Sequence, residues 1–402
     1  MSAARWRRAM SSQPAGAAGA AAGRWPAGDA TGRGRWSSAS GAAREAVLPG
    51  RPIAAGSVPE PSGSALGRLV AHLQPRHLLV LAALLAYPVF ATPFFTFQVG
   101  AQALALGLIA LSLAFLGGYG GMVSLSQMTV AGVAGYMVAI FGSSSVGSIS
   151  LGWPWWLAAV LALVVATAFG AVVGWLSVRT AGIYTIMITL AVGVAFFYLA
   201  QQNYALFNGF QGFNQVAAPV VGGIDLKRPV PFYYLALAAA LAAYWFVKYL
   251  ARAPFGVALQ GIRDNPRRMA SLGYAVTAHR VAAHAVAALL AAVGGVLMVW
   301  YNGRISPGSI GTGAMINVLV VAVLGGMRHP IGAFVGAVVF VLLQNFAIDL
   351  VDRERFNLVI GGVFLLIVLF SPDGLLGLWS WLRARVRAAG GRAGAAGARR
   401  DR

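Results

Sequence analysis

About ten long apolar runs follow one another between residues 78 and 371, each near the length of a membrane-spanning helix. Such a helix needs roughly 20 apolar residues, because the hydrocarbon core is about 30 Å thick and each residue adds about 1.5 Å. We therefore predict an all-α fold, a polytopic transmembrane helical bundle of about ten helices. The expected spans lie near residues 78–95, 99–116, 124–142, 155–176, 184–200, 232–250, 280–301, 313–327, 330–348 and 356–371.

The distribution of charge divides the chain into three parts. Charged residues make up 10% of the 402 residues and the net charge is +20, whereas soluble domains average roughly 25% charged residues. We interpret residues 1–76 as a disordered, basic Ala/Gly/Arg-rich cytoplasmic extension, since it has too few large apolar side chains to offset its ordering entropy. The alternative is that translation begins downstream of part of it. Residues 77–377 are then the transmembrane domain, and residues 378–402 form a basic cytoplasmic tail. The apolar middle makes the lipid bilayer the expected partner and argues against nucleic acid.

Basic residues in the connections predict the orientation, because Lys and Arg are enriched in cytoplasmic loops. Alternating spans from a cytoplasmic N-terminus give an excess on the inner side, and an even number of spans keeps both basic ends inside. The expected inner residues are Arg179, Lys248, Arg252, Arg263, Arg267, Arg268, Arg280 and Arg328. The expected outer residues are Lys227, Arg228 and Arg304, with Arg353 and Arg355 offset by Asp349, Asp352 and Glu354.

Carboxylates are missing from the predicted spans. Between residues 78 and 348 the acidic residues are Asp225 and Asp264, and both fall in predicted loops. Proton-driven carriers usually need a titratable group inside the membrane, so a proton-coupled carrier is disfavoured. A sodium-coupled carrier is less strictly excluded, because unwound backbone carbonyls can bind the ion.

The sequence also lacks the motifs of nucleotide hydrolysis and metal binding. A Walker phosphate loop requires Gly-Lys before Ser or Thr, but Lys227 follows Leu226 and Lys248 follows Val247. There is no cysteine, and the five histidines do not have the spacing of metal ligands. We expect a transport subunit and not an enzyme, without catalytic residues, a metal or a cofactor of its own, so that active transport would use ATP bound by partner subunits.

The stretch 117–127 is the first candidate for function. Gly117, Gly118, Gly120 and Gly121 make a helix costly, at roughly 1 kcal/mol per glycine relative to alanine, and polar Ser124, Ser126 and Gln127 follow. Non-helical backbone at membrane depth persists only when it is buried in protein or lines a wet cavity, where its amides could hold a carboxylate or amide of a solute. The alternative is a plain cytoplasmic turn. Leu324-Gly325-Gly326 repeats part of the pattern and indicates two pseudo-related halves.

The inner connection 251–279 is the second candidate. Pro266 suits a first helical turn, so residues 254–274 predict two short helices with a bend at Asp264-Asn265. Val257, Leu259, Ile262 and Met269 indicate an amphipathic segment. A basic, amphipathic helix pair could dock into a groove on a partner, and the alternative is a solvated loop that carries charge for topology.

Five stretches in order resemble the LivM-type permeases, the membrane subunits of ABC importers for branched-chain amino acids and related solutes. These stretches are the Gly-rich segment 117–135, Arg179–Leu190, Pro254–Tyr274, Ile305–Gly336 and the closing Ser371-Pro372-Asp373-Gly374-Leu375-Leu376-Gly377. The resemblance covers about residues 90–377.

The resemblance implies a multi-pass protein of a prokaryotic plasma membrane, partnered by a second, LivH-type permease, two cytoplasmic ABC ATPase subunits and an extracytoplasmic solute-binding protein. It implies that the solute path includes the 117–127 segment, with Tyr184, Thr185 and Thr189 nearby. The ATPase-coupling residues that it implies are Phe255, Gly256, Leu259, Ile262, Arg263, Asp264, Asn265 and Gly273.

Departures from the family pattern leave the solute open. The family usually has Gly-Gln-x-Ser-Leu-Gly-His where this chain has Gly-Met-Val-Ser-Leu-Ser-Gln over residues 121–127, so Ser126 and Gln127 are changed. Branched-chain or other amino acids, urea and small amides all remain candidates. A stand-alone secondary carrier or channel is the rival function, and a membrane-bound enzyme with its site near 349–355 is a further one.

Overall fold

The computed structural model describes residues 75–180 and 182–350, together with residues 361, 362, 365, 369 and 374–377. The predicted extension 1–76 lies outside the described residues apart from Pro75 and Arg76. The predicted tail 378–402 and most of the predicted span 356–371 also lie outside them.

Five helices in the described part are long and apolar enough to cross a membrane. They are the continuous helix Phe95–Gly120, which comprises η1 (Phe95–Ala101) and α3 (Gln102–Gly120), followed by α5 (Trp155–Ser177), α6 (Ile183–Gln202), α8 (Pro229–Arg252) and α11 (Val276–Asn302). A sixth span results if α12 (Thr312–Gly325) and α13 (Pro330–Leu350) count as one, although a bend of 117° separates them. The all-α membrane fold is confirmed, while the count of ten helices stays a prediction.

Two apolar helices are shorter than a full span. α2 (Pro75–Phe90) ends earlier than the predicted run 78–95, and the next helix begins within that run. Pro93 stands at this boundary, where its missing N–H costs nothing in a first helical turn. The helix α4 (Gln127–Phe141) has 15 residues, so it is about 22 Å long and shorter than the hydrocarbon core.

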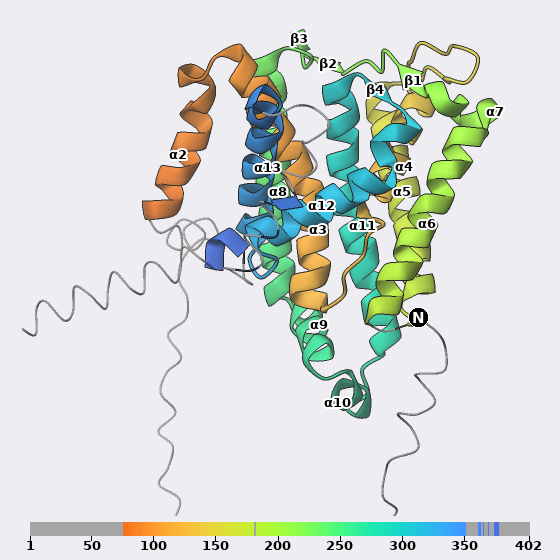
Figure 1. The fold of residues 1–402 in the computed structure, drawn as a ribbon, viewed down its shortest axis with the longest axis vertical. Coiled ribbons are helices and arrows are strands. Elements are labelled where there is room, and N and C mark those ends of the chain that lie inside the picture. The colour runs from red at the N-terminus through yellow and green to blue at the C-terminus, as the bar shows by residue number, and fades with distance from the viewer. Residues whose placement is uncertain are drawn as a thin grey trace, which may run out of the picture. The chain divides into compact units, whose positions relative to one another are not determined.

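The helices α3 and α11 form the centre of the bundle (Figure 1). α11 packs on α3, α4 and α5, while α3 also packs on α13 and α8. Close approach depends on small residues, because apolar helices gain little from hydrophobic burial against each other in lipid. At Gly295 of α11, an added Cβ would lie 2.1 Å from the carbonyl oxygen of Ala131 in α4. The helices α5, α6 and α8 are more exposed along their apolar faces.

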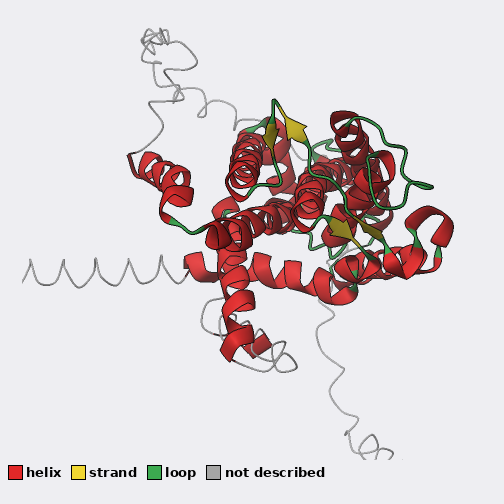
Figure 2. Ribbon diagram, turned by 90° about the horizontal axis from the view of Figure 1, so that it is seen from above, coloured by secondary structure: helices red, strands yellow, loops and turns green. Residues whose placement is uncertain are grey.

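Short elements occupy the two ends of the bundle (Figures 1 and 2). One end carries α7 (Tyr204–Phe207), η2 (Gly209–Gln211), η3 (Pro307–Ile310) and two small antiparallel sheets. β1 (Phe213–Asn214) pairs with β4 (Arg304–Ile305), and β2 (Val220–Val221) pairs with β3 (Ile224–Asp225). The other end carries α9 (Pro254–Asp264) and α10 (Pro266–Ser271).

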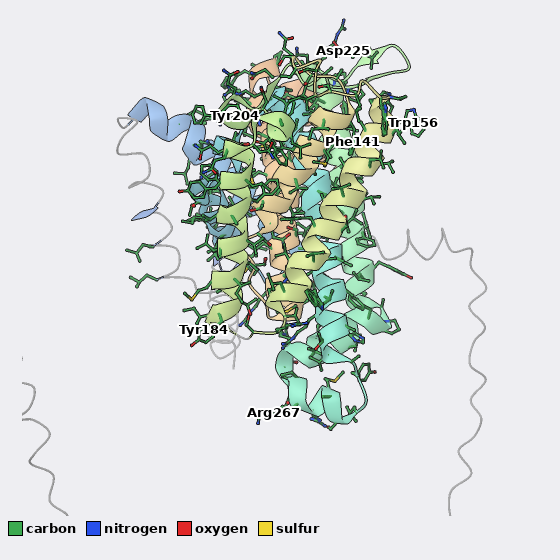
Figure 3. The ribbon with its side chains drawn as sticks, turned by 90° about the vertical axis from the view of Figure 1, so that its right-hand side faces the viewer. Phe141, Trp156, Tyr184, Tyr204, Asp225 and Arg267 are labelled. Atoms are coloured by element: carbon green, nitrogen blue, oxygen red, sulfur yellow. The ribbon has the colours of Figure 1, made fainter. Side chains whose placement is uncertain are left out.

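The side chains labelled in Figure 3 mark the two ends of the bundle. Asp225 and Trp156 lie at the end with the sheets, and Arg267 lies at the opposite end with Tyr184. We call these the sheet end and the α9 end.

Candidate functional site: a helix break joined to two short helices

The glycines at the end of α3 are helical, which corrects one prediction. Gly117, Gly118 and Gly120 belong to α3, and the helix ends only where Gly121 adopts a left-handed φ of 65°. The reason is packing, because the turn after α12 lies directly on these glycines. A Cβ on Gly118 would be 2.3 Å from the carbonyl oxygen of Met327. Tertiary contact therefore outweighs the low helix propensity of glycine, and the non-helical segment shrinks to residues 121–126.

This segment, which we call the first break, turns back along α3. The Ser112 hydroxyl lies 3.1 Å from Oε1 of Gln127, the first residue of α4. Ser112 precedes the last residue of α3 by eight positions, or about 12 Å along a helix. Ser124, Ser126 and Gln127 are buried. These contacts favour a break inside the bundle over a solvated turn.

Hydroxyl groups of α3 and α6 reach the first break and Gln127, the residue that follows it. The Ser124 and Ser126 hydroxyl oxygens are 2.9 Å apart. The backbone N–H of Leu125 donates to the hydroxyl of Thr189 in α6 across 3.1 Å, which ties the break to a helix 64 residues further along the chain. The cluster is neutral and rich in hydrogen-bonding groups.

The predicted solute-path residues divide into two groups. Thr189 is brought to the break, and Thr185 is buried one helical turn away on the same face of α6. Tyr184 is 65% exposed and lies at the α9 end, so it does not approach the cluster (Figure 3).

Two buried hydroxyl-bearing residues near the first break, Ser112 and Thr129, were not singled out from the sequence. Ser112 lies inside the apolar run of α3, and the buried hydroxyl of Thr129 in α4 has no hydrogen-bond partner among the described residues. Their signal was a polar side chain within a predicted span, which is a functional hint in membrane helices.

The predicted pair of short helices with a bend at Asp264-Asn265 is confirmed. Pro254 and Pro266 occupy the first turns of α9 and α10, where proline costs little. Between them, the side chain of Asn265 caps α10 by accepting a hydrogen bond of 3.0 Å from the N–H of Arg268.

The apolar face of α9 packs on its own bundle, so docking of the helix pair on a partner stays a prediction for its outer surface. Leu259 and Ile262 are fully buried, and α9 contacts α3, α8 and α11. Gly256 packs on the end of α8, where an added Cβ would lie 2.1 Å from the Leu250 carbonyl oxygen. Phe255 stacks on His279 with a centroid distance of 5.8 Å. The surface open to a partner is therefore α10, which has no buried residues, and the outer side of α9.

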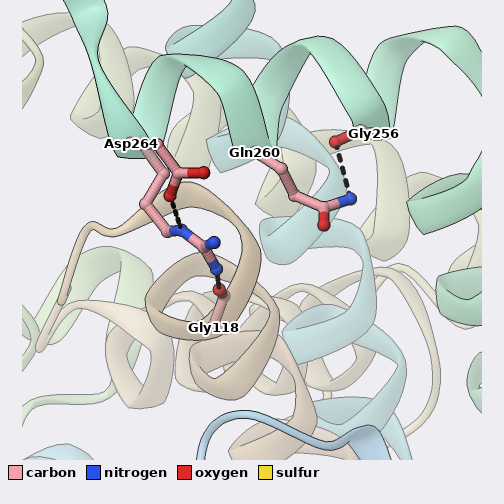
Figure 4. Close-up of polar contacts among 5 residues, drawn as sticks. Gly118, Gly256, Gln260 and Asp264 are labelled. Carbon is pink, nitrogen blue, oxygen red and sulfur yellow. Dashed lines mark hydrogen bonds and ion pairs between the residues drawn. The ribbon is translucent and has the colours of Figure 1, made fainter.

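Arg263 joins α9 to the first break (Figure 4). Its Nε is 2.9 Å from Oδ1 of Asp264, and its Nη1 donates to the carbonyl oxygen of Gly118. Its aliphatic portion covers Gly121, where an added Cβ would lie 2.5 Å from Cγ of Arg263. One side chain thus holds both the last turn of α3 and the first residue beyond it. Gly273, by contrast, has a φ of 88° and no neighbouring atom within 4 Å of an added Cβ.

A second break separates α12 from α13. Its first residue, Gly326, has a φ of 99°, and Gly374 of the closing motif packs on it. Met327 in this break is the residue that covers Gly117 and Gly118. The two breaks therefore meet across the end of α3, which also contacts Arg263.

The fold and these contacts define an all-α, multi-pass membrane protein with polar groups at a helix break. Residues 95–369 match the family described as branched-chain amino acid transport system / permease component. Since this is more than half of the chain, the chain belongs to that family.

Curated relatives agree with the assignment. The chain is 26% identical over 278 residues to the high-affinity branched-chain amino acid transport system permease protein LivM of Salmonella typhimurium, covering 63% of the chain and 65% of LivM. It is 26% identical over 285 residues to the LivH permease protein of Escherichia coli, covering 67% of the chain and 90% of LivH. It is 30% identical over 131 residues to a nucleoside ABC transporter permease protein, NupC, of Lactococcus lactis, covering 32% of the chain and 40% of NupC. The match thus spans about two thirds of LivM. No solved structure matches the chain.

Proposed function

We propose that this chain is a membrane-spanning permease subunit of an ATP-driven ABC importer. Family membership supports the class. The observation that carries the mechanism is the bond from Arg263 to the Gly118 carbonyl, because it connects the helix pair to the last turn of α3, directly before the first break. The chain would pair with a second, LivH-type permease, two cytoplasmic ATPase subunits and an external solute-binding protein.

Energy would enter through α10 and the outer side of α9. ATPase subunits that approach or separate on nucleotide binding would move α9, and Arg263 would transmit that movement to the end of α3. The first break would then alternate between the closed packing seen here and an arrangement open to solute. Nucleotide and solute would each bias this two-state equilibrium, so their effects are reciprocal.

The proposed orientation places the α9 end in the cytoplasm. That end carries basic residues from the α5–α6 connection, from the end of α8 and from both short helices, as the positive-inside rule requires. Both termini would then be cytoplasmic, and about ten helices in two pseudo-related halves would complete the bundle. The pairing of one glycine-bearing break with another supports the two halves.

The proposed solutes are amino acids or small amide-like molecules. The cluster offers neutral hydroxyl and amide groups, which suit carboxylate or amide atoms of a solute that loses its water. Branched-chain amino acids follow from the names of the LivM and LivH relatives. The family-atypical Ser126 and Gln127 lie within the cluster and make a urea- or amide-type specificity the alternative.

The test compares Arg263→Ala with Arg267→Ala in the assembled transporter. Both changes remove one arginine from the helix pair, but Arg267 is exposed on α10 and its side chain makes no hydrogen bond or ion pair within the described part of the chain. We expect Arg263→Ala to lower solute transported per ATP hydrolysed by about threefold to tenfold, since a hydrogen bond from a charged group contributes roughly 1.5–3 kcal/mol and Arg263 is partly exposed. Arg267→Ala should keep the wild-type ratio. Equal ratios in both variants would remove Arg263 from the coupling role.

A further inference from the structure

A cavity that carries basic side chains lies beside α9 and is separate from the first break. It is a cavity of about 530 Å³ between the ends of α3 and α8, the middle of α9 and the start of α13. Its volume falls within the range of small-molecule sites, roughly 300–1,000 Å³. Its lining residues are Tyr119, Tyr244, Lys248, Ala251, Arg252, Gln260, His329, Pro330, Ile331 and Leu376.

Two basic side chains of α8 give the cavity a positive charge. Lys248 and Arg252 lie four residues apart in the last turns of α8, and no acidic residue occurs among the described residues that line the space. Asp264, four residues after the lining residue Gln260, pairs with Arg263. The cavity therefore favours an anion.

Aromatic side chains hold the lysine at the rim. Lys248 Nζ donates to the Tyr244 hydroxyl across 3.4 Å and lies 5.5 Å and 5.7 Å from the ring centroids of Tyr244 and Trp245. A long basic side chain beside aromatic rings is typical of the membrane–water interface, where the charge reaches toward the headgroups.

The adjoining surface of α8 indicates the source of the anion. Trp245, Phe246 and Tyr249 are all exposed on the same last turns of the helix. Exposed aromatic residues at the end of a spanning helix mark the level of the lipid headgroups. A basic cavity between transmembrane helices at this level is a typical site for an anionic headgroup.

We infer that this cavity binds the phosphate-bearing headgroup of an anionic phospholipid, with Lys248 and Arg252 as the residues that contact the phosphate. The inference rests on the proposed function only in placing the α9 end at the inner leaflet. A bound lipid would touch both α9 and the start of α13, and so would stabilise the present packing of the helix pair.

The experiment measures lipid retention by the purified full-length chain in detergent. Native mass spectrometry would compare phosphatidylglycerol with phosphatidylcholine, and a thermal-shift assay would compare phosphatidylglycerol with free glycerol 3-phosphate. The variant is Lys248→Gln/Arg252→Gln. The control is Arg267→Gln/Arg268→Gln, which removes the same charge from exposed α10.

We expect the wild type and the control to retain phosphatidylglycerol over phosphatidylcholine. The Lys248→Gln/Arg252→Gln variant should lose about tenfold or more of that preference, because each basic group near an anionic surface contributes roughly a fivefold factor. Equal retention by variant and control would overturn the inference. A thermal shift by glycerol 3-phosphate equal to that by phosphatidylglycerol would also overturn it, in favour of a soluble phosphate ligand. The assay contains no ATPase subunit, so a negative result would not bear on the proposed coupling role of Arg263.

Discussion

The two helix breaks use opposite kinds of contact. The first break, residues 121–126, is lined with hydroxyl groups and is joined to α6 through one hydrogen bond from Leu125 to Thr189. The second break, after α12, is held by backbone packed on backbone. A Cβ on Gly325 would lie 1.8 Å from the carbonyl oxygen of Gly332, and one on Gly336 would lie 2.1 Å from that of Val321.

This difference suits the two breaks to different mechanical behaviour. Hydroxyl pairs can exchange partners with a solute or water at little net change in hydrogen bonding. Closely packed backbones cannot rearrange in this way, because protein interiors tolerate very little added volume. The second break is thus suited to act as a fixed support for the end of α3, and the first break as the part that rearranges.

The largest expected effect is at the second break. Gly325→Ala should prevent correct packing of α12 on α13, because the methyl group would overlap the backbone of Gly332. We expect the free energy of unfolding to fall by about 3 kcal/mol or more. This loss would be seen as a large fall in apparent Tm in detergent. Gly313→Ala is the matched control in the same helix, since an added Cβ there meets nothing within 4 Å. Similar Tm values for the two variants would show that the second break is not rigid.

A smaller effect is expected where Arg263 covers the first break. Gly121→Ala introduces a side chain at φ 65° and pushes against the Arg263 side chain. The left-handed backbone conformation alone costs an alanine about 1–2 kcal/mol of stability. Gly152→Ala carries the same strain at φ 66° with nothing within 4 Å, so it measures the conformational term separately.

A transport assay separates the effects of the Gly121→Ala and Gly152→Ala variants further. We expect Gly121→Ala to lower transport per ATP hydrolysed, because it displaces Arg263 from Gly118, and Gly152→Ala to leave that ratio unchanged. Should Gly152→Ala reduce the ratio equally, backbone strain alone would explain the loss and the Arg263 contact would have no special role.

Much of the fold follows from patterns that are local in sequence. The apolar runs located the long helices, and Pro254, Pro266 and Asn265 specified two short helices with the bend between them. The glycines at 117, 118 and 120 predicted a non-helical segment, but they are helical. Their low helix propensity is outweighed by packing against Met327, which is distant in sequence. The bond from Arg263 to Gly118 spans 145 residues, so no spacing rule could have found it. Ser112 and Thr129 were visible as polar residues in apolar runs, but only the fold brings Ser112 to Gln127 at the end of the first break.

A modest effect is expected from the link between the first break and α6. Thr189→Val removes the acceptor of the Leu125 N–H and leaves a buried donor without a partner. We expect the free energy of unfolding to fall by about 1–3 kcal/mol and the KM for solute uptake to change. Thr189→Ser keeps the hydroxyl and should retain the wild-type KM. Thr185→Val is the second control, because Thr185 bonds locally to the Thr180 carbonyl. An unchanged KM in Thr189→Val would separate the first break from the solute path.

The smallest expected effect is at Tyr184, which the resemblance had placed near the solute. Tyr184 is 65% exposed and lies at the α9 end (Figure 3). Its position next to Thr185 in the helix places it on a different face of α6 from Thr185 and Thr189. Tyr184→Ala should therefore leave the KM for solute unchanged and shift stability by no more than about 0.5 kcal/mol. Uptake kinetics beside Thr189→Val provide the comparison, since both changes lie on one helix within two turns. If Tyr184→Ala altered the KM and Thr189→Val did not, solute would travel along the outer face of α6, and the hydroxyls of the first break would serve packing alone.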